Sequence, residues 1–388
     1  MDINFAVPCL LGLETPIAEE LRNMEASDVR AENGRVLFSG DENILARANI
    51  CSRFSERVLV LLGSFEAHSF EELFQGTRAL PWEQWIGADD AFPVKGYSID
   101  SDLFSVRDCQ AIIKKAVVER LKQKYSIEWF EESGPVYQIQ FSIMKNKVSL
   151  MLDTSGAGLH KRGYRQNAND APIKETLAAS LCWFSRLRPY HSLYDPMCGS
   201  GTILIEGAMM ARNIAPGVNR NFAAERWSNI PRDVWYTERE RARDLEREAH
   251  DFFAYGSDIS REAAALTAAN AEAAGVDDLV SVRCCELKKF VPQTERGTLI
   301  CNPPYGERIE EKKNLPALYT EIGERFAALD AWSMYLITSY EDAEKYIGRK
   351  ADKNRKIYNG MLKTYFYQFL GPKPPRRAAQ EKKEGTDK

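Results

Sequence analysis

Alternating apolar and polar positions predict several short strands in the first 155 residues. Ile3, Phe5 and Val7 alternate as a half-buried strand does. The pattern predicts further strands at residues 35–39, 57–62, 92–99, 136–143 and 147–153. With the helices described next, these strands predict a layered α+β region.

Helical periodicity appears between those strands. Apolar residues recur at spacings of three and four over 108–124, which gives this segment one apolar face, and a shorter helical pattern covers 44–48. Thr15 followed by Pro16 is typical of a helix start. The hydroxyl can cap the helix, and proline loses no hydrogen bond in the first turn.

The second half of the chain alternates strands with helices. Strands are expected at residues 192–196, 253–259, 280–285, 298–302 and 333–338. This alternation implies crossover connections and a mostly parallel, doubly wound sheet of the Rossmann-like α/β class. Asn359 and Gly360 form a preferred hairpin turn between strands at 356–358 and 362–369, which predicts a terminal antiparallel hairpin. The charged, aromatic-rich residues 214–250 are interpreted as an insertion.

The composition is that of a globular protein, with 388 residues, 44% hydrophobic and 28% charged. A formal charge of −4 excludes a uniformly basic protein but allows a local basic face. No apolar stretch approaches the roughly 18 residues of a membrane span, and the first residues lack the basic start of a secretory signal. The eight cysteines form no C-x-x-C pair and the four histidines no H-x-x-x-H. We therefore expect no metal site, and reduced thiols in a cytoplasmic protein.

A glycine-rich turn at residues 195–202, Asp-Pro-Met-Cys-Gly-Ser-Gly-Thr, joins a predicted strand to a helix. Ligands of open parallel sheets lie beyond the carboxyl ends of strands, where glycines let the backbone approach closely. The spacing fits neither a P-loop nor G-x-G-x-x-G, so the ligand need not be a triphosphate. An ordinary glycine turn is the alternative interpretation of this motif alone.

Two further strand ends carry polar side chains. Asp258 ends a predicted strand and could either accept the hydroxyls of a ribose or cap the following helix. The sequence Asn302-Pro303-Pro304-Tyr305 ends another strand. The prolines fix the backbone and present carbonyls, so the Asn302 oxygen and a proline carbonyl could hold an NH2 group, while Tyr305 offers a flat face to a planar base. A rigid proline turn with a packed tyrosine is the alternative.

The combination D-P-M-C-G-S-G-T, a strand-end aspartate and N-P-P-Y closely resembles the class I S-adenosylmethionine-dependent amino-methyltransferases. In addition, residues 158–165, G-L-H-K-R-G-Y-R, ahead of A-P-I-K-E resemble the junction of one subfamily, the RlmL-like THUMP-domain RNA methyltransferases of the short Gram-positive type. The resemblance covers about residues 1–370. It implies S-adenosylmethionine as cofactor and methylation of guanine N2 in 23S ribosomal RNA.

The resemblance also implies a domain order. It places a ferredoxin-like region at 1–60, a THUMP RNA-binding domain at 61–155, a linker at 156–170 and a methyltransferase domain at 171–371. Residues 372–388, rich in Pro, Lys, Arg and Glu, are expected to be disordered.

The family's functional residues map onto the motifs of this chain. The resemblance implies that the cofactor is bound by Asp195, Cys198, Gly199, Gly201, Thr202, Asp258, Ile259 and Glu286. It implies that the target amine and base are held by Asn302, Pro303, Pro304 and Tyr305.

Two clusters of basic residues are candidates for RNA contact. One spans residues 107–124, on and next to the predicted helix, and includes Lys114 and Lys115. The other lies in the linker and consists of Lys161, Arg162, Tyr164 and Arg165. Such groups neutralise phosphates. A solvated helix face is an equally good interpretation of the first cluster.

Other functions share parts of this pattern. N-P-P-Y also suits methylation of adenine N6 in DNA or RNA, or of a glutamine amide. From another class, the chain could be a non-catalytic RNA-binding assembly factor with a vestigial cofactor pocket. The preferred interpretation names ribosomal RNA as the partner, with neither a membrane nor an obligate protein partner.

Overall fold

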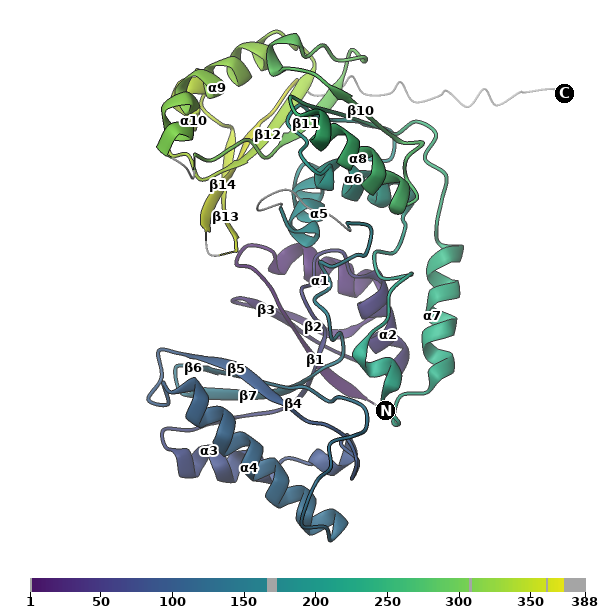
Figure 1. Cartoon of the computed structure of the whole chain (residues 1–388), viewed down its shortest axis with the longest axis vertical. Coiled ribbons are helices and arrows are strands. Elements are labelled where there is room, and N and C mark those ends of the chain that lie inside the picture. The colour runs from purple at the N-terminus through teal and green to yellow at the C-terminus, as the bar shows by residue number, and fades with distance from the viewer. Residues whose placement is uncertain (1, 166–172, 307–308, 361, 373–388) are drawn as a thin grey trace, which may run out of the picture.

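Two seven-stranded sheets organise the described part of the chain (Figure 1). The computed structural model describes residues 2–165, 173–306, 309–360 and 362–372. The predicted disordered tail therefore lies almost entirely outside the described residues. Within the described ranges, no helix is long and apolar enough to cross a membrane.

The first sheet has the strand order β2-β3-β1-β4-β7-β6-β5. All neighbouring strands are antiparallel except β5 and β6. Its elements are β1 Ile3–Pro8, α1 Glu14–Asn23, β2 Ser27–Glu32, β3 Arg35–Gly40, α2 Glu42–Cys51, β4 Leu59–Glu66, α3 Phe70–Ala79, the 3-10 turn η1 Trp82–Gln84, β5 Val94–Ile99, α4 Val106–Tyr125, β6 Ile139–Met144 and β7 Lys147–Asp153.

One apolar row crosses the centre of this sheet. Phe5 pairs with Val60, Val60 with Leu152, and Leu152 with Ile139, and all four side chains are buried in one core. Paired residues face the same side of a sheet, so the core is continuous from β1 to β6. The predicted boundary at residues 60 and 61 falls inside β4, because one sheet spans both N-terminal regions.

Local details differ from the sequence prediction. Helix α1 begins at Glu14 without a side-chain cap, so Thr15 is not the capping residue. The Glu14 carboxylate instead accepts hydrogen bonds from the backbone N–H groups of Gly12 and Gly34. Strand β2 was not predicted. Nearly all of its side chains are exposed, so its sequence shows no alternation of apolar and polar residues. Helix α3 was also missed, although Ser69 and Glu72 form a capping box at its start.

The second sheet has the strand order β10-β9-β8-β11-β12-β14-β13. The five strands from β10 to β12 are parallel, and β14 and β13 close the sheet as an antiparallel pair. Its elements are α5 Glu175–Phe184, β8 Ser192–Asp195, α6 Thr202–Arg212, β9 Phe253–Asp258, α8 Arg261–Ala273, β10 Val280–Cys284, the 3-10 turn η3 Leu287–Lys289, β11 Gly297–Cys301, α9 Ile309–Ala327, β12 Trp332–Thr338, α10 Ala343–Ile347, β13 Lys353–Asn359 and β14 Leu362–Phe369.

This topology confirms the predicted doubly wound sheet with a terminal hairpin. The hairpin turn differs by one residue from the prediction. Asn359 pairs with Leu362 and so belongs to β13. The loop therefore begins at Gly360, whose φ of 62° suits a glycine.

The insertion at 214–250 lies between α6 and β9 of the second domain and packs against the first sheet and its helices. It contains the 3-10 turn η2 Ala223–Arg226 and helix α7 Arg232–Asp244, which runs beside α2 (Figure 1). The Trp227 ring stacks on Tyr137 with ring centres 4.4 Å apart, and its indole N–H donates to the carbonyl of Val136 at 3.0 Å. The insertion thus packs against both N-terminal regions while belonging to the second sheet's fold.

A buried ion pair completes this junction. The Arg47 guanidinium of α2 donates two hydrogen bonds, both 2.8 Å long, to the Glu238 carboxylate of α7. The side chains are only 9% and 3% exposed. Bidentate pairing of this kind fixes orientation as well as distance.

We expect Arg47→Ala to lower the free energy of unfolding by about 3–5 kcal/mol, because the buried Glu238 would lose both hydrogen bonds to Arg47 and keep only a 4.0 Å contact with Arg241. Urea unfolding followed by tryptophan fluorescence measures this loss. The matched control is Arg243→Ala, which removes an exposed pair with Glu240 in the same helix and should change stability by less than about 1 kcal/mol. Equal effects of the two substitutions would contradict the assigned role of the buried pair.

Candidate active site at the strand ends

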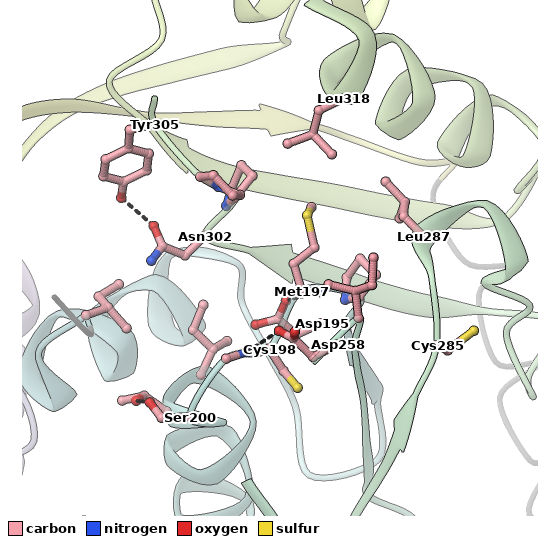
Figure 2. Close-up of a pocket in the computed structure, with 18 of the residues that line it drawn as sticks. Asp195, Met197, Cys198, Ser200, Asp258, Cys285, Leu287, Asn302, Tyr305 and Leu318 are labelled. Carbon is pink, nitrogen blue, oxygen red and sulfur yellow. Dashed lines mark hydrogen bonds between the residues drawn. The ribbon is translucent and has the colours of Figure 1, made fainter. Parts of the chain in front are cut away.

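A pocket of about 870 Å³ opens at the carboxyl ends of β8, β9 and β11 (Figure 2). The structure brings to it eleven of the twelve residues predicted to bind cofactor or target, and only Gly201 does not line it. Residues that were not predicted to bind a ligand complete the wall, among them Met197, Leu287, Leu318, Asn359 and Leu362.

The glycine loop after β8 is held from two sides. The Cys198 N–H donates to the carbonyl of Ser257 in β9 at 3.0 Å. From α8, the Thr267 hydroxyl donates to the carbonyl of Gly199 at 2.9 Å and the Asn270 amide to that of Ser200 at 3.0 Å. These two α8 side chains could not be predicted from the sequence, since a threonine and an asparagine within a helix form no motif.

Gly201 has a packing role in this loop. Its φ is 78°, and a Cβ atom there would lie 2.5 Å from Cγ2 of Thr267. Any side chain would therefore push the loop away from α8. Gly201 shapes the loop rather than lining the pocket.

Asp258 faces the same loop. Its Oδ2 atom accepts from the N–H of Gly199 and its Oδ1 atom from the N–H of Ser260, both at 2.9 Å. The cap of α8 is Ser260, whose hydroxyl oxygen accepts from the N–H of Ala263 at 3.1 Å. Ser260, and not Asp258, is thus the cap of α8, and the Asp258 carboxylate lines the pocket.

Asp195 is the most deeply buried acid of the pocket, with 2% of its surface exposed. Its Oδ1 atom accepts from the N–H of Met197 at 3.2 Å. Burial raises its pKa to about 7, and the charge of Asp258 adds to the rise. A cationic ligand group placed nearby would offset this cost and favour the ionised carboxylate.

Asn302 and Tyr305 interact directly. The Tyr305 hydroxyl donates to Oδ1 of Asn302, as the dashed line in Figure 2 shows. An amide oxygen has two lone pairs, so Oδ1 can accept a second hydrogen bond from a ligand amine. Pro303 is buried and Pro304 is exposed. The strand end therefore holds the predicted amide acceptor with its direction set by a tyrosine.

Glu286 and Ile259 lie at the opposite end of the pocket. The Glu286 carboxylate pairs with Lys288 at 2.5 Å and with Lys289 at 3.3 Å. These lysines lower its pKa. Ile259, which lines the same pocket, is 75% exposed. This end of the pocket thus combines a charged rim with an apolar side chain that a ligand could cover.

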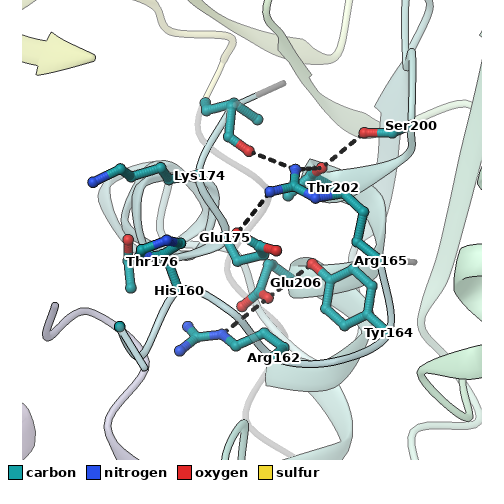
Figure 3. Close-up of polar contacts among 12 residues, drawn as sticks. His160, Arg162, Tyr164, Arg165, Lys174, Glu175, Thr176, Ser200, Thr202 and Glu206 are labelled. Carbon is teal, nitrogen blue, oxygen red and sulfur yellow. Dashed lines mark hydrogen bonds and ion pairs between the residues drawn. The ribbon is translucent and has the colours of Figure 1, made fainter. Parts of the chain in front are cut away.

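The structure corrects the expected RNA-binding role of Arg162 and Tyr164 (Figure 3). Both are buried, at 6% and 5% exposure. The Arg162 guanidinium donates to the carbonyls of Leu159 and Arg53, at 2.7 and 2.5 Å, and the Tyr164 hydroxyl donates to the buried Glu206 carboxylate at 3.0 Å. Their polar groups are used inside the protein, so they cannot meet phosphates.

Arg165 also points inward. Its guanidinium donates to the carbonyl of Ile173 at 3.0 Å, to the Thr202 hydroxyl at 3.4 Å and to the Glu175 carboxylate at 3.0 Å. It therefore supports the start of α6, where the glycine loop ends (Figure 3). This arginine belongs to the support of the pocket, which corrects its predicted contact with RNA.

The two lysines predicted for RNA contact in helix α4 also differ, because Lys114 is paired within the protein and Lys115 is exposed. The Lys114 ammonium donates to Glu132 at 2.5 Å and to the carbonyl of Phe92 at 3.1 Å, and burial lowers its pKa. These contacts engage the Lys114 ammonium within the protein and leave its side chain 31% exposed, so they do not favour the predicted contact with RNA. Lys115 and Lys161 are exposed.

Three family descriptions match the chain. The description "RMKL-like, methyltransferase domain" matches residues 162–368, "RlmL ferredoxin-like domain" matches residues 4–59, and "THUMP domain" matches residues 67–153.

Curated relatives agree with these matches. The chain is 42% identical to "Putative RNA methyltransferase YpsC" of Bacillus subtilis (strain 168), over 96% of this chain and 97% of the relative. It is 33% identical to "Ribosomal RNA large subunit methyltransferase K/L" of Cellvibrio japonicus, over 93% of this chain. The alignment covers 50% of that longer relative.

Solved structures share the whole fold. One, described as a "predicted N6-adenine-specific DNA methylase" of Listeria monocytogenes, is 42% identical with a TM-score of 0.91, over 96% of this chain and 97% of the other. Another, described as "a putative methyltransferase complexed with SAH", is 39% identical with a TM-score of 0.90, over 96% and 99%.

We expect Asp195→Asn to stabilise the ligand-free protein at pH 8, because the carboxylate is ionised there although it is buried. The pKa of about 7 in the fold exceeds the ordinary value of 3.8. Wild-type stability is therefore lost as pH rises through 7 and regained as pH falls. The advantage of the variant should shrink by about 3 kcal/mol between pH 8 and pH 5.

Thermal and urea unfolding at pH 5, 7 and 8 measure this effect. Asp330→Asn, at an exposed aspartate outside the pocket, is the control and should show no such pH dependence. A D195N variant that is less stable than wild type at every pH would refute the burial cost.

Proposed function

The chain belongs to the family of RMKL-like methyltransferases, and on that premise we propose that it methylates the exocyclic N2 of a guanine in large-subunit ribosomal RNA, with S-adenosylmethionine as methyl donor. One observation supports this proposal above the others. Asp195, Asp258 and Asn302 come from the ends of three neighbouring strands and line a single pocket. Its volume of about 870 Å³ is ample for a cofactor together with a base.

The pocket fits the cofactor in two chemical respects. Burial disfavours the ionised form of Asp195, and a nearby cation would stabilise that form. The amino-acid end of the cofactor carries an ammonium group that can supply this charge. Asp258 presents carboxylate oxygens at a strand end, where ribose hydroxyls are bound in related nucleotide folds. We therefore assign the methionine end to Asp195, Cys198, Gly199 and Thr202, the ribose to Asp258, and the adenine region to Ile259 and Glu286.

The target amine is assigned to the end of β11. When bound, S-adenosylmethionine supplies a methyl group that is already activated by a positive sulfonium. The protein's task is to align the acceptor, which relies on position rather than on a strong base. The guanine amine is a poor nucleophile because its lone pair is delocalised into the ring. The Asn302 oxygen and the Pro303 carbonyl would stabilise the positive charge that develops on the nitrogen.

The N-terminal regions are assigned to RNA binding. Residues 67–153 match the THUMP domain, and the curated relatives carry RNA methyltransferase names. We propose the division into residues 1–60, 61–155, a linker at 156–170 and a catalytic domain at 171–371. A paired base could not reach the pocket, so the target must be flipped out or lie in a loop. Of the basic residues predicted for RNA contact, Lys115 and Lys161 keep this role.

Methylation of adenine N6 is the second candidate. The name of the Listeria structure favours it, and the amide acceptor of Asn302 would serve either amine. The match of residues 67–153 to the THUMP domain and the RNA methyltransferase names of the curated relatives argue against a DNA substrate. A vestigial pocket is disfavoured, since the cavity is open and its acids face it.

The proposal is tested with the purified full-length chain, methyl-deuterated S-adenosylmethionine and large-subunit ribosomal RNA from cells that lack the enzyme. Mass spectrometry of the digested nucleosides should find deuterium in N2-methylguanosine. Label in N6-methyladenosine would select the second candidate, and no label in any nucleoside would overturn both.

We expect Asn302→Ala to lower kcat by about two to three orders of magnitude, as the loss of a preorganised transition-state contact does. Binding of S-adenosylhomocysteine, measured by calorimetry, should stay within about threefold of wild type, because Asn302 is assigned to the target and not the cofactor. Tyr305→Phe keeps the ring and removes only the hydroxyl that directs Asn302, so its loss should be smaller. Equal loss of turnover and cofactor binding in N302A would show that Asn302 is misassigned.

A further inference from the structure

The terminal hairpin carries a compact cluster of lysines and tyrosines on one face. Lys356 and Tyr358 alternate along β13, and Lys363 and Tyr365 along β14. Lys356 pairs with Tyr365, and Tyr358 pairs with Lys363. Paired residues and residues two apart face the same side of a sheet, so these four side chains form one surface, which we call the Lys/Tyr face.

The geometry within the Lys/Tyr face is that of cations beside aromatic rings. The Lys356 ammonium lies 5.3 Å from the centre of the Tyr358 ring, and the Lys363 ammonium lies 5.0 Å from that of Tyr365. Both lysines are exposed, and both tyrosines are half-buried. Among the described residues, neither ammonium group has a carboxylate within ion-pair distance. A hydrogen bond with the Tyr365 side chain raises the pKa of Lys363, and the more distant Glu341 adds to the rise. Both ammonium groups are therefore accessible to an anionic ligand.

The hairpin that carries the Lys/Tyr face reaches the active-site pocket at its tip. Asn359 and Leu362 line that pocket, and because they are the neighbours of Tyr358 and Lys363 in the strands, their side chains lie on the other face of the hairpin. Leu362 and Tyr305 also line a second hollow of about 470 Å³, to which Lys312 and Tyr340 contribute. A strand of nucleic acid that leaves the target pocket would thus meet an aromatic hollow and then the exposed lysines.

The hairpin also borders the N-terminal regions. The carbonyl oxygen of Lys356 lies 3.5 Å from the position that a Cβ atom on Gly12 would occupy. In Figure 1 the hairpin extends from the second sheet toward the first. The Lys/Tyr face therefore lies on a hairpin that links the pocket to the region proposed to hold RNA.

We propose that the Lys/Tyr face binds single-stranded RNA that flanks the target nucleotide, with the second hollow taking the neighbouring base. This inference rests on the proposed function and names its RNA contact. Tyrosine rings stack on any base, and ammonium groups between them meet the phosphates, which is the usual composition of single-strand binding surfaces. Glu341 and Asp342, at the rim of the hollow, repel phosphate and accept hydrogen bonds from base N–H groups, so they favour a base at that position.

The test measures binding of a fluorescent single-stranded oligoribonucleotide and the KM for ribosomal RNA. The double variant Lys356→Ala/Lys363→Ala should bind at least tenfold more weakly, with a matching rise in KM and little change in kcat. Its dependence of log affinity on log salt concentration should become shallower by about 1.4, or about 0.7 for each lost phosphate contact. Binding of S-adenosylhomocysteine should be unchanged.

The matched control is Lys350→Ala/Lys353→Ala, which removes the same charge from two exposed lysines, one at the first residue of β13 and one three residues before that strand. It should bind RNA within about twofold of wild type. Tyr358→Ala should weaken binding about fivefold or more through lost stacking, and Tyr358→Phe should restore it. Only stacking predicts that rescue, because a phenylalanine lacks the hydroxyl but keeps the ring.

The two proposals fail in different ways. If wild type methylates RNA and both double variants behave alike, the Lys/Tyr face is not an RNA site although the proposed function stands. If the Lys356/Lys363 variant loses RNA affinity while wild type transfers no methyl group to any RNA, the surface assignment stands and the proposed function is wrong.

Discussion

The reversal of strand order beside β8 is the constraint on which the rest of the site depends. The chain proceeds from β8 outward to β9 and β10 and then returns to β11 on the other side. This switch point leaves a crevice at the carboxyl ends of the central strands. Asp195, Asp258 and Asn302 each end or follow one of these strands, so residues more than 100 positions apart meet in one pocket. Helix α8 keeps the crevice open by holding the glycine loop through Thr267 and Asn270.

Buried polar contacts between α6, the linker and the first half of the chain are a second constraint, and they hold the pocket against the N-terminal regions. Glu206 in α6 is fully buried and meets Arg162 and Tyr164 of the linker, while Arg162 also donates to the backbone of Arg53 in the first half of the chain. The insertion adds the Arg47–Glu238 pair and the Trp227 ring stacked on Tyr137. Buried polar contacts of this kind tolerate little displacement because a separated charge would lose its partners inside the protein. The distance between the RNA-binding regions and the pocket is therefore fixed by the fold.

The sequence was sufficient for the parts of this structure that depend on local pattern. Strand-end motifs identified Asp195, Asp258 and Asn302, and alternation identified the parallel sheet, because both signals lie within a few neighbouring residues. The direction of the linker side chains could not be predicted from such local patterns. Arg162 and Tyr164 look like surface residues next to Lys161, and only the tertiary position of Glu206 draws them inside. The same holds for Lys114, whose partner Glu132 lies beyond the end of its helix. Strand β2 was missed because its exposed side chains leave no apolar pattern.

The most direct test of this account is a crystal structure of the full chain with S-adenosylhomocysteine. The account predicts that the ligand lies over the glycine loop, with its ribose hydroxyls on the Asp258 carboxylate, its amino-acid end beside Asp195 and its sulfur toward Asn302. A ligand bound elsewhere, or one whose sulfur points away from the end of β11, would contradict the convergence of donor and acceptor in a single pocket.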